Sequence, residues 1–193
     1  MGQQSGIQDQ IAAAFGGINL IKMDAYPHAT VQQLTLPQAT IQELEQRLLL
    51  IYLGKPHSSS AVHEKVIREM EDIGPTAAPI EALRQTAEVS KSCLQHRDLS
   101  GLGRAMIENT AGQRMLHPDL VSQAAECVIK IGRRFGVLGH KINGAGGDGG
   151  SVTLLTDGDV QAKVDLTNAI LQENETWQIV PLKLAHEGLI VSG

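Results

Sequence analysis

The stretch between residues 139 and 151 is rich in glycine, and it is the part of the chain that most clearly indicates a functional site. Five glycines fall within the seven residues 144–150. Glycine costs about 1 kcal/mol relative to alanine inside a regular element, so such a cluster needs a backbone reason. A chain that turns with positive φ, or one that approaches a phosphate closely, supplies that reason. A flexible surface hairpin is the alternative.

The same residues match a dinucleotide-binding pattern in form only. Residues 144–149 read G-x-G-x-x-G, which in a dinucleotide-binding fold joins a strand to a helix. Residues 151–156 are β-branched and apolar and indicate a strand instead. No helix N-terminus would then face a pyrophosphate, so we do not predict that fold.

A carboxylate near the start of the chain is the second candidate for chemistry. Asp9 lies in the segment Ser-Gly-Ile-Gln-Asp-Gln at residues 5–10. An alanine-rich helix is predicted over residues 7–15, and the two glycines that follow end it. A carboxylate at a helix start stays ionised readily. Asp9 either takes part in proton transfer or has only a structural place at the start of the helix.

Composition excludes several classes of function. The net charge is −5 and no dense Lys/Arg cluster occurs, so nucleic acid binding has no electrostatic basis. No apolar run is long enough to span a membrane, and nothing near Met1 resembles a signal peptide. Cys93 and Cys127 lack a C-x-x-C spacing and suggest buried, reduced thiols in a cytoplasmic protein. The seven histidines are not at ligand spacing, so we expect no metal site made of protein ligands alone.

The hydrophobic pattern predicts a mixed chain of helices and strands. We expect strands at 18–23, 30–36, 47–53, 137–143, 151–156, 177–184 and 186–191, helices at 7–15, 79–96, 99–110, 118–135 and 157–171, one helical turn at 40–45, and a further helix after the serines at 58–60. From about residue 46 the order is strand, several helices, two strands, helix, strand. That order predicts an α+β sandwich with an antiparallel sheet and helices on one face.

Two segments together resemble motifs of the GHMP kinase superfamily, named for galactokinase, homoserine kinase, mevalonate kinase and phosphomevalonate kinase. Residues 5–17 look like the segment around the catalytic aspartate of its sugar kinases, and residues 139–150 resemble its third glycine motif. The residues of the two motifs are most similar to those of the heptose-phosphate kinase and fucokinase branch, which also has residues similar to 53–55, 108–109 and 117–118. The resemblance covers essentially the whole chain.

The resemblance implies a two-lobed kinase. Residues 46–193 would form the C-terminal domain, a ferredoxin-like α/β sandwich, and residues 1–45 would be a remnant of the N-terminal lobe. The family's phosphate-gripping motif, of the kind P-x-x-x-G-L-G-S-S, does not occur in these residues. We therefore expect the C-terminal portion of an ATP-dependent sugar or sugar-phosphate kinase that is inactive without the missing lobe. The alternative is a non-catalytic binding or regulatory module that keeps the fold.

The resemblance also assigns roles to individual residues. Asp9 would accept or orient the proton of the sugar hydroxyl, with ATP as the phosphoryl donor and Mg²⁺ as cofactor. Gln8, Lys55 and Lys141 would lie near the substrate. Gln8 could equally be a solvent-exposed residue of a glutamine-rich segment, and Lys141 a strand lysine that reaches for solvent. The phosphate loop would consist of Gly144, Ala145, Gly146, Gly147, Asp148 and Gly149.

Two further expectations follow from the resemblance. Asp148 departs from the family's run of glycines, and a carboxylate about 4 Å from a phosphate costs roughly 4 kcal/mol at an effective dielectric near 20. It would point away, interact with magnesium or contact the sugar. Strands 18–23 and 30–36 would have unpaired edges, which favours homodimers. Asp9 and the glycine loop should converge on one cleft once the missing lobe is restored.

Overall fold

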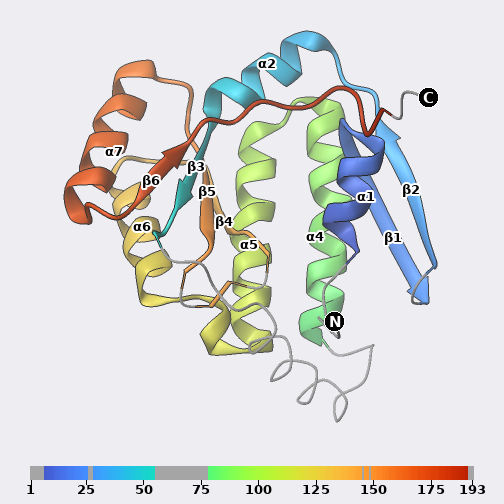
Figure 1. Cartoon of the computed structure of the whole chain (residues 1–193), viewed down its shortest axis with the longest axis horizontal. Helices are drawn as coiled ribbons and strands as arrows, with labels where there is room; N and C mark the ends of the chain where they lie inside the picture. Colours follow the sequence, from blue (N-terminus) through green and yellow to red (C-terminus); the bar gives the residue numbers. More distant parts are fainter. Residues whose placement is uncertain (1–6, 26–27, 55–77, 145, 148, 191–193) are drawn as a thin grey trace.

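The computed structural model of the protein describes residues 7–25, 28–54, 78–144, 146–147 and 149–190 (Figure 1). In this part of the chain the elements are α1 Gln8–Phe15, β1 Ile18–Ala25, β2 His28–Leu34, α2 Gln38–Arg47, β3 Leu48–Tyr52, α4 Ala78–His96, α5 Leu99–Leu116, the 3₁₀ turn η1 Pro118–Leu120, α6 Gln123–Arg134, β4 Gly139–Ile142, β5 Ser151–Leu155, α7 Val160–Glu173 and β6 Gln178–Val180. The predicted α+β class with antiparallel sheets is confirmed.

The main sheet has four strands in the order β4-β5-β3-β6, and every neighbouring pair is antiparallel. At its centre, Ile51 of β3 pairs with Val152 of β5 on one side and with Ile179 of β6 on the other. Side chains alternate between the faces of a strand, and the alternation buries Leu49 and Ile51 on one face. The position of β4 at the edge puts the glycine loop that follows it at a corner of the sheet.

Helices α6 and α7 cover one face of this sheet. The core between them consists of aliphatic residues and one tryptophan, including Leu49, Ile51, Val152 and Leu154 from the strands, Val128 and Ile129 from α6, Leu166 and Ile170 from α7, and Trp177. A second cluster joins α2, α4 and α5 to the end of β5 through Leu44, Leu94, Leu102 and Leu155. The aliphatic composition of the chain therefore fills two adjoining cores.

Strands β1 and β2 form a separate two-stranded sheet beside the main body (Figure 1). Ile18 pairs with Leu34 and Ile21 with Val31 in an antiparallel register. Helix α1 and helix α4 both contact β1. The hairpin thus carries α1, with its candidate carboxylate, against the rest of the molecule.

The predicted strands near the C-terminus are shorter or absent. The strand expected at 177–184 ends at Val180, because Pro181 has no N–H to donate to the sheet. Residues 186–190 of the strand expected at 186–191 are irregular. The C-terminal segment bonds instead to α1 and to the residue after its C-cap. Leu189 N donates to Ala13 O at 3.1 Å, and Gly17 N donates to Ala185 O at 2.6 Å.

Several helices differ from the predicted ones. The helix expected over 118–135 is split, because Ser122 accepts a hydrogen bond from Ala125 N and starts α6 after the turn η1. The turn expected at 40–45 is the full helix α2, and α5 continues past the expected end at residue 110. The helix expected after residues 58–60 lies outside the described residues.

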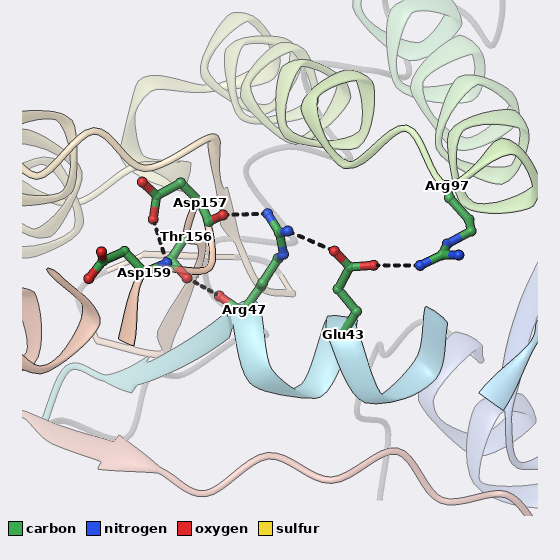
Figure 2. Close-up of polar contacts among 6 residues, drawn as sticks. All are labelled: Glu43, Arg47, Arg97, Thr156, Asp157 and Asp159. Carbon is green, nitrogen blue, oxygen red and sulfur yellow. Dashed lines mark hydrogen bonds and ion pairs between the residues drawn. The ribbon is translucent and has the colours of Figure 1, made fainter. Parts of the chain in front are cut away.

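Arg47 at the end of α2 ties this helix to the turn that follows β5 (Figure 2). Its guanidinium donates to the carbonyl oxygen of Asp157 at 2.5 Å and to the Glu43 carboxylate at 2.7 Å. Its own carbonyl oxygen accepts hydrogen bonds from the backbone N–H and the hydroxyl of Thr156. Arg97 completes the group through an ion pair with Glu43 at 3.2 Å.

Two composition-based expectations can be compared with the described residues. None of the described helices is both long and apolar enough to cross a membrane. Cys93 and Cys127 are free thiols, but each is half-buried and not buried as predicted. Burial is still sufficient to raise the pKa of both thiols.

Candidate functional site

The glycine loop connects two antiparallel strands, β4 and β5, as the sequence predicted. Its glycines take positive φ angles that side chains rarely adopt, at Gly144 (62°), Gly146 (62°), Gly147 (84°), Gly149 (122°) and Gly150 (74°). Ala145 and Asp148 lie outside the described residues, so their roles stay predictions. The positive angles give the backbone reason that the cluster required.

Polar side chains fix the base of this loop. Asn143 N donates to Ser151 O at 3.0 Å, which closes the last rung between the two strands. The Asn143 amide also donates to the hydroxyl groups of Ser151 and Thr153 at 3.0 and 2.9 Å. The hydroxyl of Thr153 in turn lies 3.1 Å from the Asn143 amide oxygen. The loop therefore starts and ends on a rigid frame.

The loop also packs closely on its neighbours. A Cβ atom on Gly146 would lie 1.9 Å from the carbonyl oxygen of Leu120 in η1. Only glycine fits at that position. On the other side, Gly150 O accepts a hydrogen bond of 2.9 Å from Leu53 N, just after β3. These two contacts hold the described part of the loop against η1 and the end of β3.

Helix α1 presents the candidate carboxylate at its N-terminus. Asp9 is in the first turn and is exposed to solvent. The first turn of a helix favours a negative charge there. No residue of α1 is buried. The helix is held instead at its C-terminal end, where Gly16 and Gly17 contact the C-terminal segment of the chain.

Gln8 and Lys141, which come from α1 and β4, line one hollow of about 540 Å³. Its other polar lining residues are Asn19, Ser90 and Lys91. Asp9 does not line it. Two of the predicted substrate-contacting residues are thus brought together. The predicted convergence of Asp9 with the glycine loop stays a prediction.

The electrostatics of this hollow favour an anion. Burial lowers the pKa of Lys141 to about 8 from an ordinary value of 10.5. Its ammonium donates to the carbonyl oxygen of Ile142 at 2.9 Å, and no carboxylate of the described residues forms an ion pair with it. Lys91 donates to Gln32, and none of the lining residues is acidic. A phosphate or carboxylate in the hollow would stabilise the Lys141 charge.

A second hollow of about 470 Å³ lies beside the glycine loop. Gly147 lines it together with residues of η1 and the first turn of α6, among them Ser122 and Gln123. Of the two hollows, only this one is lined by a described residue of the glycine loop, whereas the hollow with the lysines is reached by Lys141 of β4. Within the described residues, no group of three His, Cys, Asp or Glu side chains could hold a metal ion.

The remaining predicted residues have these positions. Lys55 lies outside the described residues. His140, expected to be structural, is 2% exposed, and burial with the nearby Arg133 charge lowers its pKa to about 4. Asn109 donates to the Thr86 hydroxyl at 2.8 Å, and His117 accepts a hydrogen bond from Asp119 N. Both contacts are internal to the fold.

One residue beside the loop was missed by the sequence reasoning. Gln113 of α5 donates from its side-chain Nε2 to the carbonyl oxygen of Gly144 at 3.0 Å. The predicted helix stopped at residue 110, so Gln113 fell in a connection. Gln113 could have been found from the sequence only if the predicted helix had been continued to residue 116.

The chain is similar to carbohydrate kinases, although no protein-family model matches it. It is 26% identical over 164 residues to the bifunctional fucokinase/GDP-fucose pyrophosphorylase of Arabidopsis thaliana, a match that covers 82% of this chain and 15% of that protein. It is 24% identical over 149 residues to the D-glycero-alpha-D-manno-heptose 7-phosphate kinase of Campylobacter jejuni, covering 77% of this chain and 44% of that protein. The chain thus spans less than half the length of either relative.

A solved structure shares the fold. The mevalonate kinase of L. major, determined in complex with R-mevalonate, superposes with a TM-score of 0.68 at 24% sequence identity. The match covers 90% of this chain and 50% of that enzyme. The fold of this chain is therefore found in about half of that mevalonate kinase.

Proposed function

We propose that this chain forms part of an ATP-dependent sugar or sugar-phosphate kinase of the GHMP superfamily, because its relatives include a fucokinase and a heptose-phosphate kinase and its fold is shared with a mevalonate kinase. The observation that carries the proposal is the hollow shared by Gln8 and Lys141, which joins the carboxylate-bearing helix to the strand before the glycine loop. Residues 46–193 would be the C-terminal domain of the kinase, and residues 1–45 would belong to its N-terminal lobe.

Each element would have one task in phosphoryl transfer. Asp9, exposed at the start of α1, orients the sugar hydroxyl and accepts its proton. Gln8 hydrogen-bonds the sugar, and Lys141 neutralises charge on the transferred group or on the substrate. The backbone N–H groups of Gly146, Gly147 and the following glycines lie along the phosphate.

Magnesium fits this arrangement only through the nucleotide. The described residues lack a cluster of metal-ligating side chains, and Mg²⁺ is commonly held by substrate phosphates with one or two carboxylates. The ion would neutralise phosphate charge. Asp148 is one carboxylate of the loop that could approach it, in keeping with the alternatives left open for that residue.

We expect the 193-residue chain by itself to turn over little ATP. The segment of the kind P-x-x-x-G-L-G-S-S that grips the phosphates in the family is absent from its sequence. The competing function is a binding or regulatory module without catalysis. The two differ in the consequence of removing the Asp9 carboxylate, which matters only to an enzyme.

The experiment is a sugar and sugar-phosphate screen with Mg·ATP on the complete gene product that contains these residues. Asp9→Asn should lower kcat by about 10²–10⁴-fold with KM little changed. Asp165→Asn, an exposed carboxylate on α7, is the matched control and should leave kcat unchanged. Full activity of Asp9→Asn, or turnover by the 193-residue chain equal to that of the complete product, would contradict the corresponding part of the proposal.

We also propose a cytoplasmic location and self-association through β1 and β2. The two strands pair only with each other among the described residues, and open strand edges tend to pair with another chain. Free thiols suit a reducing compartment. Sedimentation over a range of concentrations tests the association, and a monomer at the highest concentration would exclude it.

A further inference from the structure

Helix α5 runs along the edge strand β4 and contacts it at three levels. At the first level, a Cβ on Gly139 would lie 2.5 Å from Gly103, so the two backbones touch. At the second, the Thr110 hydroxyl lies 3.2 Å from the carbonyl oxygen of His140. At the third, Gln113 donates to the carbonyl oxygen of Gly144, the first glycine of the loop. The helix thus holds the strand up to the point where the loop begins.

The Gln113 contact differs from the other two. Its side chain belongs to a residue that is 8% exposed, and its Oε1 atom has no hydrogen-bond partner within the part of the chain that the structure describes. A buried acceptor without a partner destabilises a fold by more than one average hydrogen bond stabilises it. Gly144, by contrast, is exposed, so water can bind its carbonyl oxygen if Gln113 does not.

These contacts imply that Gln113 contributes to the position of the loop and not to the stability of the fold. An apolar side chain of similar size at residue 113 would remove the unpartnered acceptor and lose only a bond that water can replace. The fold would then be no less stable. What the amide does supply is a fixed direction for the Gly144 carbonyl group, at the point where the loop begins.

We propose that Gln113 is a positioning residue, which fixes the Gly144 peptide so that the N–H groups of the glycine loop face the phosphates of ATP. It acts through the loop and does not itself touch the nucleotide. The inference rests on the proposed function, because it assumes that the loop binds a phosphate. It adds a residue from a helix that neither the motif nor the hollows include.

The test compares Gln113→Met with wild type in three measurements, both in the complete gene product that contains these residues. Thermal unfolding should give a melting temperature equal to or above that of wild type. Amide hydrogen exchange of the peptides covering residues 139–155 should be about tenfold faster without ligand. Calorimetric titration should give about tenfold weaker binding of Mg·ATP, which is a loss of about 1.4 kcal/mol. Gln113→Asn, which keeps the amide but shortens its reach, should show the same two effects on the loop.

Gln172→Met, on the exposed face of α7, is the matched control and should change none of the three. A lower melting temperature with unchanged loop exchange would overturn the inference, because Gln113 would then be only structural. Faster exchange with unchanged Mg·ATP affinity would also overturn it. If the wild-type protein does not bind Mg·ATP at all, the proposed function is wrong and so is the inference that rests on it. This outcome is distinguishable from the two above, in which the wild-type protein does bind Mg·ATP.

Discussion

Gln8 at the start of α1 and Lys141 in the edge strand β4 line the same hollow, although about two thirds of the chain separates them in sequence. The Lys141 ammonium is desolvated there and donates to a backbone carbonyl oxygen. A partly buried cation without a carboxylate partner destabilises the protein in the absence of an anion. An anion bound in the hollow would offset this cost.

Lys141→Met should remove that destabilisation. In the folded protein the Lys141 pKa is lowered to about 8 from 10.5, so between these values the unfolded chain binds more protons than the folded one. Wild-type stability should then rise with pH across this window. Thermal unfolding at pH 7, 8, 9 and 10 should find the methionine variant more stable at pH 7, with a difference that shrinks toward pH 10. Lys130→Met, an exposed residue of α6, controls for general charge effects, and a difference independent of pH would contradict the argument.

Gly146→Ala should strongly destabilise the loop. The added methyl group would lie 1.9 Å from Leu120 O, and the backbone has a φ of 62°. The left-handed conformation costs about 1–2 kcal/mol and the overlap about 1–3 kcal/mol, so we expect about 2–5 kcal/mol in urea unfolding.

Gly144→Ala provides the matched comparison for this variant. Gly144 has the same φ of 62°, but nothing lies within 4 Å of an added Cβ. Its cost should be only the conformational part, about 1–2 kcal/mol. Equal losses for the two alanine variants would show that the contact with η1 does not constrain the loop.

Arg47→Met should loosen α2 from the turn after β5 (Figure 2). The substitution removes the hydrogen bonds to Asp157 O and to Glu43, and charge-assisted bonds contribute about 1.5–3 kcal/mol. Urea unfolding should give a loss in that range. Arg104→Met removes a solvent-exposed pair at 3.7 Å and should change stability by less than about 0.5 kcal/mol. A loss for Arg47→Met no larger than that would exclude the clamp.

The sequence was sufficient for features whose cause is local. Five glycines between two apolar runs predict a loop with positive φ angles, and the structure has both strands and the angles. Glycine encodes that conformation by lacking a side chain, so no tertiary information is needed. Pro181 and Ser122 are equally local signals for the end of β6 and the start of α6. The hydrophobic pattern continues past both residues, so the predicted strand and helix were too long.

Features that depend on contacts between residues far apart in the sequence could not be predicted from the local sequence. The apolar residues 189–191 resemble a strand, yet Leu189 N bonds to Ala13 O of helix α1. Leu184 N is likewise bound by the Glu45 carboxylate of α2, and Figure 1 shows this C-terminal segment crossing toward α1. Which backbone groups pair across such distances is decided by packing and not by local pattern. The neighbourhood of Gln113 and Gly144 is hidden for the same reason.

His140 should make stability depend on acid. Burial lowers its pKa to about 4 from 6.5, so below pH 6.5 the unfolded chain binds a proton that the folded protein does not. Wild-type stability should therefore fall as the pH drops from 6.5 to 4, by at most about 3 kcal/mol from this group, at 1.36 kcal/mol for each pKa unit. His140→Gln cannot take up a proton and should flatten this fall, measured by urea unfolding at pH 7, 6, 5 and 4. His186→Gln, at an exposed position, should keep the wild-type slope, and a His140→Gln profile parallel to wild type would mean that this buried imidazole does not govern the acid response.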